Sequence, residues 1–163
     1  LLVTKEGRIT LEAEPLPAAD PDPQRVAVAP GRADSSDPFL YHKTTNRGLY
    51  EAARAACPGY DDVLLLNERG EVMESTIANV AVEIEGKLCT PPVQCGLLPG
   101  TLRADLLARG VLIEQCITVE QMLGSPRVFL LNSVRGMYRV QVFEAPENKT
   151  DRSQSRLSFP PLS

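Results

Sequence analysis

The pattern of hydrophobic and polar positions predicts short strands joined by turns. β-Branched and leucine residues on either side of a Glu-Gly pair predict a hairpin over residues 1–13. A continuous run of valine and leucine at residues 62–67 predicts a buried strand, and the alternation at residues 79–85 predicts a strand with one exposed face. Because turn-forming residues 68–71 lie between them, we expect these two strands to form a hairpin.

Three segments have features of helices. Residues 44–57 carry leucine and alanine at helical spacing and end before a Pro-Gly pair. A Pro-Gly-Thr sequence opens a second helix that runs through Arg109, and Gly110 ends it. A brief third helix is expected near residues 120–123. The sequence therefore predicts few helices, and all of them are short.

The remaining apolar runs predict further strands at residues 88–90, 111–119, 127–131 and 137–143. Six of the fourteen prolines fall in residues 14–38, so this segment is expected to be mostly loop, with one edge strand at 25–29.

Strands that follow one another in hairpins, with few helices, are typical of an α+β fold with a mostly antiparallel sheet or open barrel. Residues 1–144 are expected to form one domain. Residues 145–163 are rich in proline, serine and asparagine, which predicts a flexible tail.

Charge and composition exclude several classes of function. The 163 residues suffice for one domain, and 17 Lys and Arg against 21 Asp and Glu give a net charge of −4. Basic residues are nowhere interleaved with aromatic ones, so a nucleic-acid partner is not expected. Since no apolar run reaches the roughly 20 residues of a membrane helix, we expect no membrane partner and a cytoplasmic location.

The cysteines and the histidine give no pattern of metal ligands. The four cysteines contain no Cys-x-x-Cys pair, and His42 is the only histidine. The sequence therefore predicts no metal site and reduced thiols, as in a cytoplasmic protein.

Lys43 has the least ordinary surroundings of the four lysines. It follows the apolar residues 38–41 and precedes the start of the first predicted helix. An amine in apolar surroundings near helix N-terminal amides can act as a nucleophile or base. The alternative is a surface lysine at a junction between two elements.

Three other segments could carry chemistry. Glu74 lies just before a predicted buried strand, where it could hold a cationic ring nitrogen or simply belong to a turn. Gly100 and Thr101 open a helix whose free amides could bind a phosphate, although ordinary loop-to-helix junctions look the same. Residues 132–136 end an apolar strand with several donors, and could contact an anion or form a β-turn.

In this order, the four segments resemble the class IV aminotransferases, pyridoxal-phosphate enzymes of fold type IV. The resemblance covers residues 1–142 and is to the large C-terminal domain of that family. It rests on Lys-x-x-Asn at Lys43 and Asn46, on Glu74 with Asn79 five residues later, and on a Leu-Pro-Gly-x-x-Arg motif over residues 98–103.

The resemblance implies a role for each motif. Lys43 would form the Schiff base with the cofactor aldehyde, and Glu74 would pair with the protonated pyridine nitrogen. The amides of Thr101 and Leu102, with the Ser133 hydroxyl, would hold the phosphate. Asn46, Asn79 and Gly100 would complete the cofactor-binding set, and Arg135 would bind a substrate carboxylate.

Two features differ from the family pattern. Leu102 stands where transaminases often have threonine, so one side-chain phosphate contact is absent. The family also has a small domain before this one, which supplies an arginine to the phosphate. Because the chain does not begin with methionine and its first residues already read as a strand, we expect it to be the C-terminal part of a longer polypeptide.

The resemblance leaves the reaction open. The sequences around Lys43 and Ser133 are similar to class IV domains fused to, or acting beside, aminodeoxychorismate synthase. This similarity implies an aminodeoxychorismate lyase of folate synthesis, which releases pyruvate and 4-aminobenzoate and is a homodimer when complete. A branched-chain or D-amino-acid transaminase would use the same residues, and a noncatalytic fragment or dimerising scaffold is the third alternative.

Overall fold

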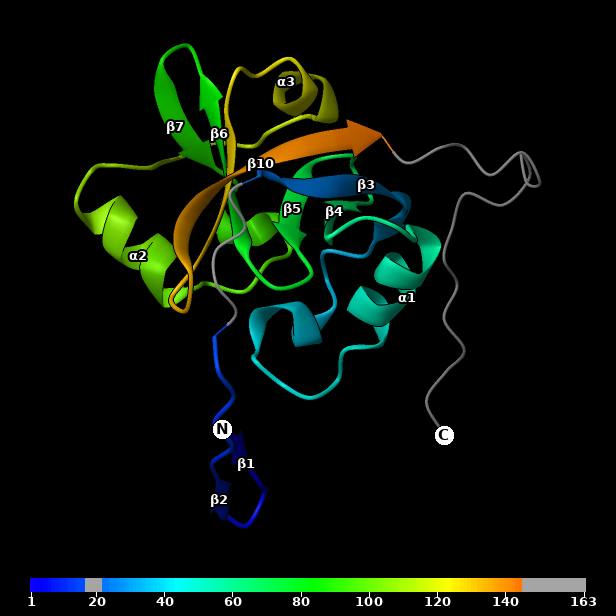
Figure 1. Ribbon diagram of the computed structural model, residues 1–163, viewed down its shortest axis with the longest axis vertical. Helices are drawn as coiled ribbons and strands as arrows, with labels where there is room; N and C mark the ends of the chain where they lie inside the picture. Colours follow the sequence, from blue (N-terminus) through cyan, green and yellow to red (C-terminus); the bar gives the residue numbers. More distant parts are fainter. Residues whose placement is uncertain (17–21, 145–163) are drawn as a thin grey trace.

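A computed structural model describes residues 1–16 and 22–144, and its main feature is a curled eight-stranded sheet (Figure 1). The order across the sheet is β5-β4-β3-β10-β9-β6-β7-β8, and β1 and β2 form a separate pair. The strands are β1 (Leu2–Val3), β2 (Ile9–Thr10), β3 (Gln24–Ala33), β4 (Asp62–Asn67), β5 (Val72–Ser75), β6 (Asn79–Ile84), β7 (Lys87–Thr90), β8 (Ile113–Glu114), β9 (Val128–Asn132) and β10 (Gly136–Glu144). The helices are η1 (Pro38–Tyr41), α1 (Gly48–Ala56), η2 (Val93–Cys95), α2 (Thr101–Ala108) and α3 (Val119–Leu123).

The α+β class is confirmed, and the sheet is antiparallel at four of its seven strand contacts. The centre is different, because β3 runs parallel to both of its neighbours, β4 and β10. The predicted edge strand at residues 25–29 is therefore wrong: β3 has ten residues and lies inside the sheet. Pro30 misled the prediction, since the β3–β4 register shifts between Val28 and Arg32, where a proline can be accommodated.

The two faces of the sheet bury different cores. The larger core contains Val26, Leu64, Val80 and Leu130, which are fully buried. The opposite face of β3 and β4 packs against α1. A third cluster lies between α2 and strands β6 and β9. Helices on both sides thus leave the middle of the sheet out of contact with water.

The predicted pairing of residues 62–67 with residues 79–85 is wrong. β4 pairs with β5, whereas β6 pairs with β7 and β9 on the other side of the sheet. The exposed face expected for this segment is also absent from most of it, since Val80, Ala81 and Val82 are all fully buried. Ala81 belongs to the cluster under α2, so a small apolar residue is buried on the face that the sequence predicts to be exposed.

Two predicted elements are shorter in the structure. The helix predicted over residues 44–57 begins at Gly48, because the Thr44 hydroxyl accepts from the Asn46 backbone N–H and forms a local turn first. The strand predicted over residues 111–119 contracts to β8, since its partner β7 ends at Pro91-Pro92 and offers only Cys89 and Thr90 for pairing.

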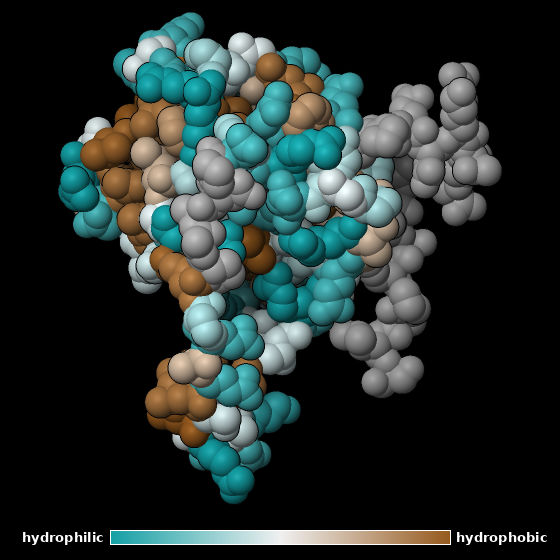
Figure 2. All heavy atoms as spheres, in the orientation of Figure 1, coloured by the Kyte–Doolittle hydropathy of each residue, from teal (hydrophilic) through white to brown (hydrophobic). Residues whose placement is uncertain are grey.

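The β1–β2 hairpin is confirmed, and it lies apart from the sheet (Figure 1). Its apolar side chains are exposed and gather on its surface in Figure 2. They are Leu1, Leu2, Val3, Ile9 and Leu11.

The helices within residues 1–16 and 22–144 are all too short or too polar to span a membrane. The tail predicted at residues 145–163 lies outside the described residues.

Candidate active site

Glu74 is a carboxylate enclosed by the protein. It is the third residue of β5, and only 5% of its surface is exposed. The Tyr50 hydroxyl donates to its Oε1 at 2.8 Å, and the Asn79 side-chain amide donates to its Oε2 at 3.2 Å. Burial raises the pKa of Glu74 to about 7, while hydrogen bonds from Tyr50 and the Leu98 backbone and the charges of Arg47 and Lys43 act in the opposite direction. Glu74 is thus a buried carboxylate whose two oxygens are held by side-chain hydrogen bonds, and it is not a turn residue.

Asn79 joins Glu74 to the loop before α2. Its amide nitrogen also donates to the Leu98 carbonyl at 2.8 Å. Its carbonyl oxygen lies so close to Gly100 that a β-carbon there would come within 2.2 Å of it. Gly100 is therefore required by close packing, and it does not adopt a positive φ angle. These contacts bring together three of the residues predicted from the sequence.

The N-terminus of α2 presents free hydrogen-bond donors. Gly100 is the N-cap and has no side chain to accept from the amides of the first turn, which begins with Thr101 and Leu102. The Thr101 hydroxyl lies 2.5 Å from the Ser133 hydroxyl, which comes from the turn between β9 and β10. Two amides and two hydroxyls therefore meet at the positive end of a helix, where an anion is stabilised.

The turn at residues 132–136 holds Ser133 beside α2. The Asn132 side-chain carbonyl accepts from the backbone N–H groups of Val134 and Arg135, at 3.0 and 2.8 Å. The segment is thus a β-turn, one of the two alternatives predicted for it, and the turn delivers the Ser133 hydroxyl to Thr101.

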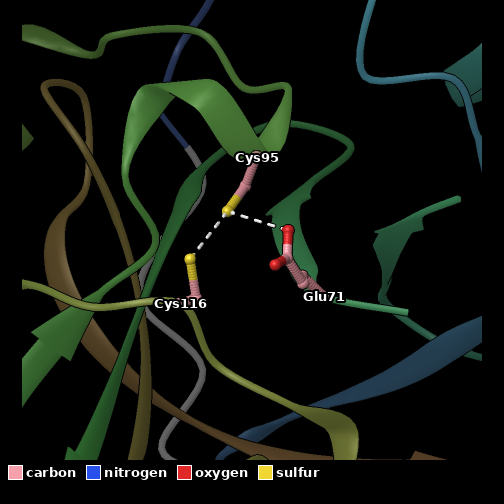
Figure 3. A group of neighbouring side chains, drawn as sticks. All are labelled: Glu71, Cys95 and Cys116. Atoms are coloured by element: carbon pink, nitrogen blue, oxygen red, sulfur yellow. Dashed lines mark hydrogen bonds between the residues drawn. The ribbon is translucent and has the colours of Figure 1, made fainter. Parts of the chain in front are cut away.

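A thiol pair lies just before the loop that leads to Gly100. Cys95 ends η2, and its sulfur is 3.8 Å from that of Cys116 and 3.5 Å from Oε2 of Glu71 (Figure 3). These three side chains form a group with the donor atoms of a metal site, although the sequence predicts none. Cysteine spacing gave no signal, because the sheet brings together residues that lie 21 positions apart.

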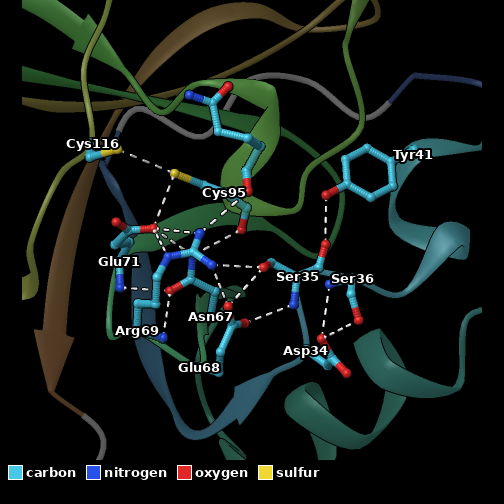
Figure 4. Close-up of polar contacts among 11 residues, drawn as sticks. Asp34, Ser35, Ser36, Tyr41, Asn67, Glu68, Arg69, Glu71, Cys95 and Cys116 are labelled. Carbon is cyan, nitrogen blue, oxygen red and sulfur yellow. Dashed lines mark hydrogen bonds and ion pairs between the residues drawn. The ribbon is translucent and has the colours of Figure 1, made fainter.

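The segment that leads to Lys43 is held by polar contacts with the β4–β5 turn (Figure 4). The Ser35 backbone N–H and hydroxyl both donate to Glu68 at 2.8 Å, and the Tyr41 hydroxyl donates to the Ser35 carbonyl at 2.6 Å. Arg69 donates to the Ser35 hydroxyl at 3.0 Å. These contacts fix η1, the last element before Lys43.

The environment predicted for Lys43 is wrong in one respect. Lys43 is exposed, and Phe39 in the preceding segment is 45% exposed. The lysine therefore does not lie in the apolar interior that the sequence predicts for it. The charge of Lys43 nevertheless contributes to lowering the pKa of Glu74, against the larger effect of burial. Asn46 is also exposed, and within the described residues no hydrogen bond joins its side chain to Glu74 or Asn79.

An open pocket of about 470 Å³ adjoins this group on the side of α1. Tyr50 lines it, as does the turn at Thr76 and Ile77, and three arginines contribute to its wall. These arginines are Arg47, Arg54 and Arg135. The pocket wall also contains Glu51 and Asp61. Arg135, which is predicted to bind a substrate carboxylate, therefore lies in a pocket that it shares with Tyr50, the hydrogen-bond partner of Glu74.

Sequence reasoning missed Tyr50 and Arg47. Tyr50 bridges the pocket and Glu74, and the Arg47 guanidinium lies 4.8 Å from the centre of the Tyr50 ring while donating to the Thr76 carbonyl at 2.5 Å. The available signal was a tyrosine in the first turn of the helix that follows Lys43. Sequence spacing could not show that this turn faces β5.

Comparisons with known proteins show the family to which the chain belongs. A candidate aminodeoxychorismate lyase of Schizosaccharomyces pombe is 30% identical over 99% of this chain and 73% of that protein. A candidate amino-acid aminotransferase structure from Mesorhizobium loti is 37% identical with a TM-score of 0.78, covering 86% of this chain and 70% of that one. The 4-amino-4-deoxychorismate lyase structure from Pseudomonas aeruginosa is 25% identical with a TM-score of 0.70, covering 82% and 54%. The family model of class IV amino-transferases matches residues 2–143, and the chain therefore belongs to the class IV aminotransferase family.

Proposed function

We propose that residues 1–144 are the large domain of a pyridoxal-phosphate lyase that acts on aminodeoxychorismate and releases pyruvate and 4-aminobenzoate. The observation that carries this proposal is the buried Glu74 carboxylate, bonded by Tyr50 and Asn79 and connected through the Leu98–Gly100 loop to an uncapped helix N-terminus. The similarity to the lyases of Schizosaccharomyces pombe and Pseudomonas aeruginosa supports the choice of reaction.

The residues present fit a phosphorylated pyridine cofactor. Glu74 is buried, and within residues 1–16 and 22–144 no cationic side chain is hydrogen-bonded to it, so a protonated ring nitrogen would supply the missing positive charge. The amides of Thr101 and Leu102, with the hydroxyls of Thr101 and Ser133, form the donor set that a phosphate requires. In this arrangement Lys43 would hold the cofactor aldehyde through its amine.

When bound, pyridoxal phosphate accepts the electron pair left at the substrate Cα after proton removal. Glu74 would keep the ring nitrogen of the bound cofactor protonated, because a carboxylate beside that nitrogen stabilises its positive charge. Tyr50 and Asn79 hold the carboxylate in place by donating to its two oxygens. The Lys43 amine takes the Cα proton and returns a proton to the departing product.

The arginine-lined pocket is suited to a substrate that carries carboxylates. Arg135 and Arg47 bring two guanidinium groups to its wall. Guanidinium groups bind carboxylates through paired hydrogen bonds. Arg54 is already engaged by the buried Asp62 at 3.4 Å, and Arg47 donates to the Thr76 carbonyl, so we assign carboxylate binding to Arg135.

A second candidate reaction is transamination of a branched-chain or D-amino acid. The similarity of 37% to the Mesorhizobium loti aminotransferase structure favours it. Glu74, Lys43 and the phosphate-binding residues would have the same roles in either reaction. The two reactions differ in whether the amino group leaves the substrate, so product analysis separates them.

The proposal includes a homodimer for the complete protein. A small domain before residue 1 would add a cationic contact to the phosphate. Such a contact contributes about 1.5–3 kcal/mol, or roughly ten- to a hundredfold in affinity. We therefore expect this chain alone to bind the cofactor weakly and the complete polypeptide to bind it more tightly. Sedimentation of the complete protein as a monomer would contradict the dimer.

The test uses the complete polypeptide supplied with pyridoxal phosphate. Aminodeoxychorismate should yield pyruvate and 4-aminobenzoate, whereas formation of glutamate from an amino acid and 2-oxoglutarate would establish the transaminase. Borohydride reduction followed by peptide mapping should label Lys43. A label on Lys5 or Lys87 would overturn its assignment, and the absence of any cofactor absorption band would favour a noncatalytic role.

Lys43→Ala should abolish both the label and product formation, and Lys87→Ala, at the exposed first residue of β7, is the matched control. Glu74→Gln should reduce turnover far more than Glu83→Gln, since Glu83 pairs with Arg127 away from the site. Equal losses in these two variants would contradict a role for Glu74 beside the cofactor ring.

A further inference from the structure

The thiols of Cys95 and Cys116 are in direct contact. Their sulfur atoms are 3.8 Å apart, and Figure 3 shows the two side chains pointing toward each other from η2 and from the segment between β8 and α3. A disulfide bond needs about 2.05 Å between the sulfurs. The gap to be closed between the two sulfurs is therefore less than 2 Å.

The backbone on both sides of this contact is held in place. The Cys95 N–H donates to the Pro92 carbonyl at 2.9 Å, and its carbonyl accepts from the Asn67 side chain at 3.2 Å. Gln115 and Ile117, on either side of Cys116, bond to Thr90 and Val72 at 3.0 and 2.8 Å. The fold therefore keeps the two sulfurs together without help from a ligand.

The two thiols differ in access. Cys116 is exposed, whereas Cys95 is fully buried. Cys116 is therefore the thiol that an external reagent meets first, and Cys95, whose sulfur is 3.8 Å away, is the thiol placed to displace that reagent.

We propose that Cys95 and Cys116 form a reversible intramolecular disulfide by exchange with a low-molecular-weight disulfide. The Cys116 thiolate attacks one sulfur of glutathione disulfide, which forms a mixed disulfide and releases one glutathione thiolate. Cys95 then attacks the Cys116 sulfur and releases the second glutathione. Two thiols lose two protons and two electrons, and one glutathione disulfide is reduced to two glutathione molecules.

A divalent metal is the competing use of the same atoms, because Glu71 completes a set of three ligands. The surroundings of Glu71 favour the disulfide. Arg69 forms an ion pair with Oε2 of Glu71 at 2.8 Å, and Asn67 donates to the same oxygen at 2.8 Å (Figure 4). The carboxylate charge nearest Cys95 is thus already neutralised by a cation.

The experiment incubates the reduced, chelator-treated complete protein with glutathione disulfide and then alkylates the remaining thiols in denaturant. Trypsin cleaves after Arg103 and Arg109, so it separates Cys116 from Cys95, but it leaves Cys89 and Cys95 on one peptide. Fragment spectra are therefore needed to assign the bond. The expected product joins Cys95 to Cys116, is two hydrogens lighter than the two free peptides, and disappears on reduction.

Two variants control the assignment. Cys116→Ser should eliminate the cross-linked peptide, and Cys89→Ser should retain it, because Cys89 contacts Gln115 and Lys87 instead. A glutathione adduct that persists on Cys116, or dimers linked through Cys116, would overturn the proposal. So would one equivalent of Zn²⁺ bound by the wild-type protein, lost in Cys116→Ser, with no disulfide formed. The measurement is covalent and independent of pyridoxal phosphate, so its outcome does not depend on the proposed function.

Discussion

At the scale of single residues, Glu74 makes the stability of the cofactor-free protein depend on pH. Burial raises its pKa from 4.5 to about 7 in the folded state. Between these two values the folded protein keeps a proton that the unfolded chain has lost, so the free energy of unfolding falls as the pH rises. The contribution is fully present below about pH 4.5 and is lost once the pH passes 7.

Glu74→Gln should remove this pH dependence, because an amide does not titrate. Urea unfolding at pH 5 and pH 8 should show the wild type losing up to about 3 kcal/mol more than the variant over this interval. Glu85→Gln, at an exposed turn, is the matched control and should retain the wild-type slope. An unchanged slope in Glu74→Gln would contradict the raised pKa.

Gly100→Ala should destabilise the loop before α2, since the new β-carbon would lie 2.2 Å from the Asn79 oxygen. The Asn79 amide would have to move and release its bonds to Glu74 and Leu98. We expect a loss of about 1–3 kcal/mol in thermal or urea unfolding, as for other overpacked sites.

Gly48→Ala is the matched control for this substitution, because a β-carbon there meets no atom within 4 Å. It lies in the first turn of α1 and should be neutral or stabilise the protein slightly. Equal losses in the two variants would contradict the steric argument.

The residues of the candidate site were predictable where they lie close in sequence to a recognisable pattern. Glu74, Asn79 and Gly100 fall into this group, and the structure joins them through Asn79. Tyr50 was not predictable, because its contact with Glu74 depends on how α1 packs against the sheet. Such long-range packing leaves no mark in local spacing.

At the scale of elements, the buried side chain of Arg103 joins α2 to the sheet by hydrogen bonds. Arg103 is 3% exposed, and its guanidinium donates to the Pro91 carbonyl at 2.8 Å and to Glu114 at 2.5 Å. The arginine of the Leu-Pro-Gly-x-x-Arg motif therefore holds the helix in position, and through it the amides at the helix N-terminus.

Arg103→Met should cost about 2–4 kcal/mol in unfolding free energy, because Pro91 and Glu114 lose a charged partner and the helix loses an anchor. Arg109→Met lies in the same region, but its pair with Asp105 is exposed, so its loss should stay below about 0.5 kcal/mol. Chemical denaturation of both variants tests the contrast. Similar losses would show that the buried contacts of Arg103 contribute little.

The elements themselves were easier to predict than their partners. Local patterns located the strands at residues 62–67 and 127–131, because a continuous apolar run is enough to indicate a buried strand. Pairing was mispredicted for β6, since neighbours in sequence were assumed to be neighbours in the sheet. The central position of β3 was missed for a different reason, because the prolines in and around this segment are typical of an edge strand.

At the scale of the whole molecule, the backbone amides of different strands should differ in their protection from hydrogen exchange. β3 is paired on both sides and its buried residues face two cores, whereas the β1–β2 hairpin has two residues per strand and pairs only with itself. Two-stranded hairpins of this size have little stability of their own. Hydrogen exchange of this chain should therefore be fast in residues 2–10 and slowest in β3 and β4. Equal protection factors in the two regions would contradict this picture.

The parallel pairing of β3 with β10 also has a consequence for synthesis on the ribosome. Val26 finds its partner Val142 only after more than a hundred further residues have been made. At about 5–20 residues per second, one edge of β3 stays unpaired for on the order of ten seconds. During that interval the nascent chain exposes an unpaired strand edge that includes the apolar residues 26–29, so we expect the chain to be most prone to aggregation before β10 has left the ribosome.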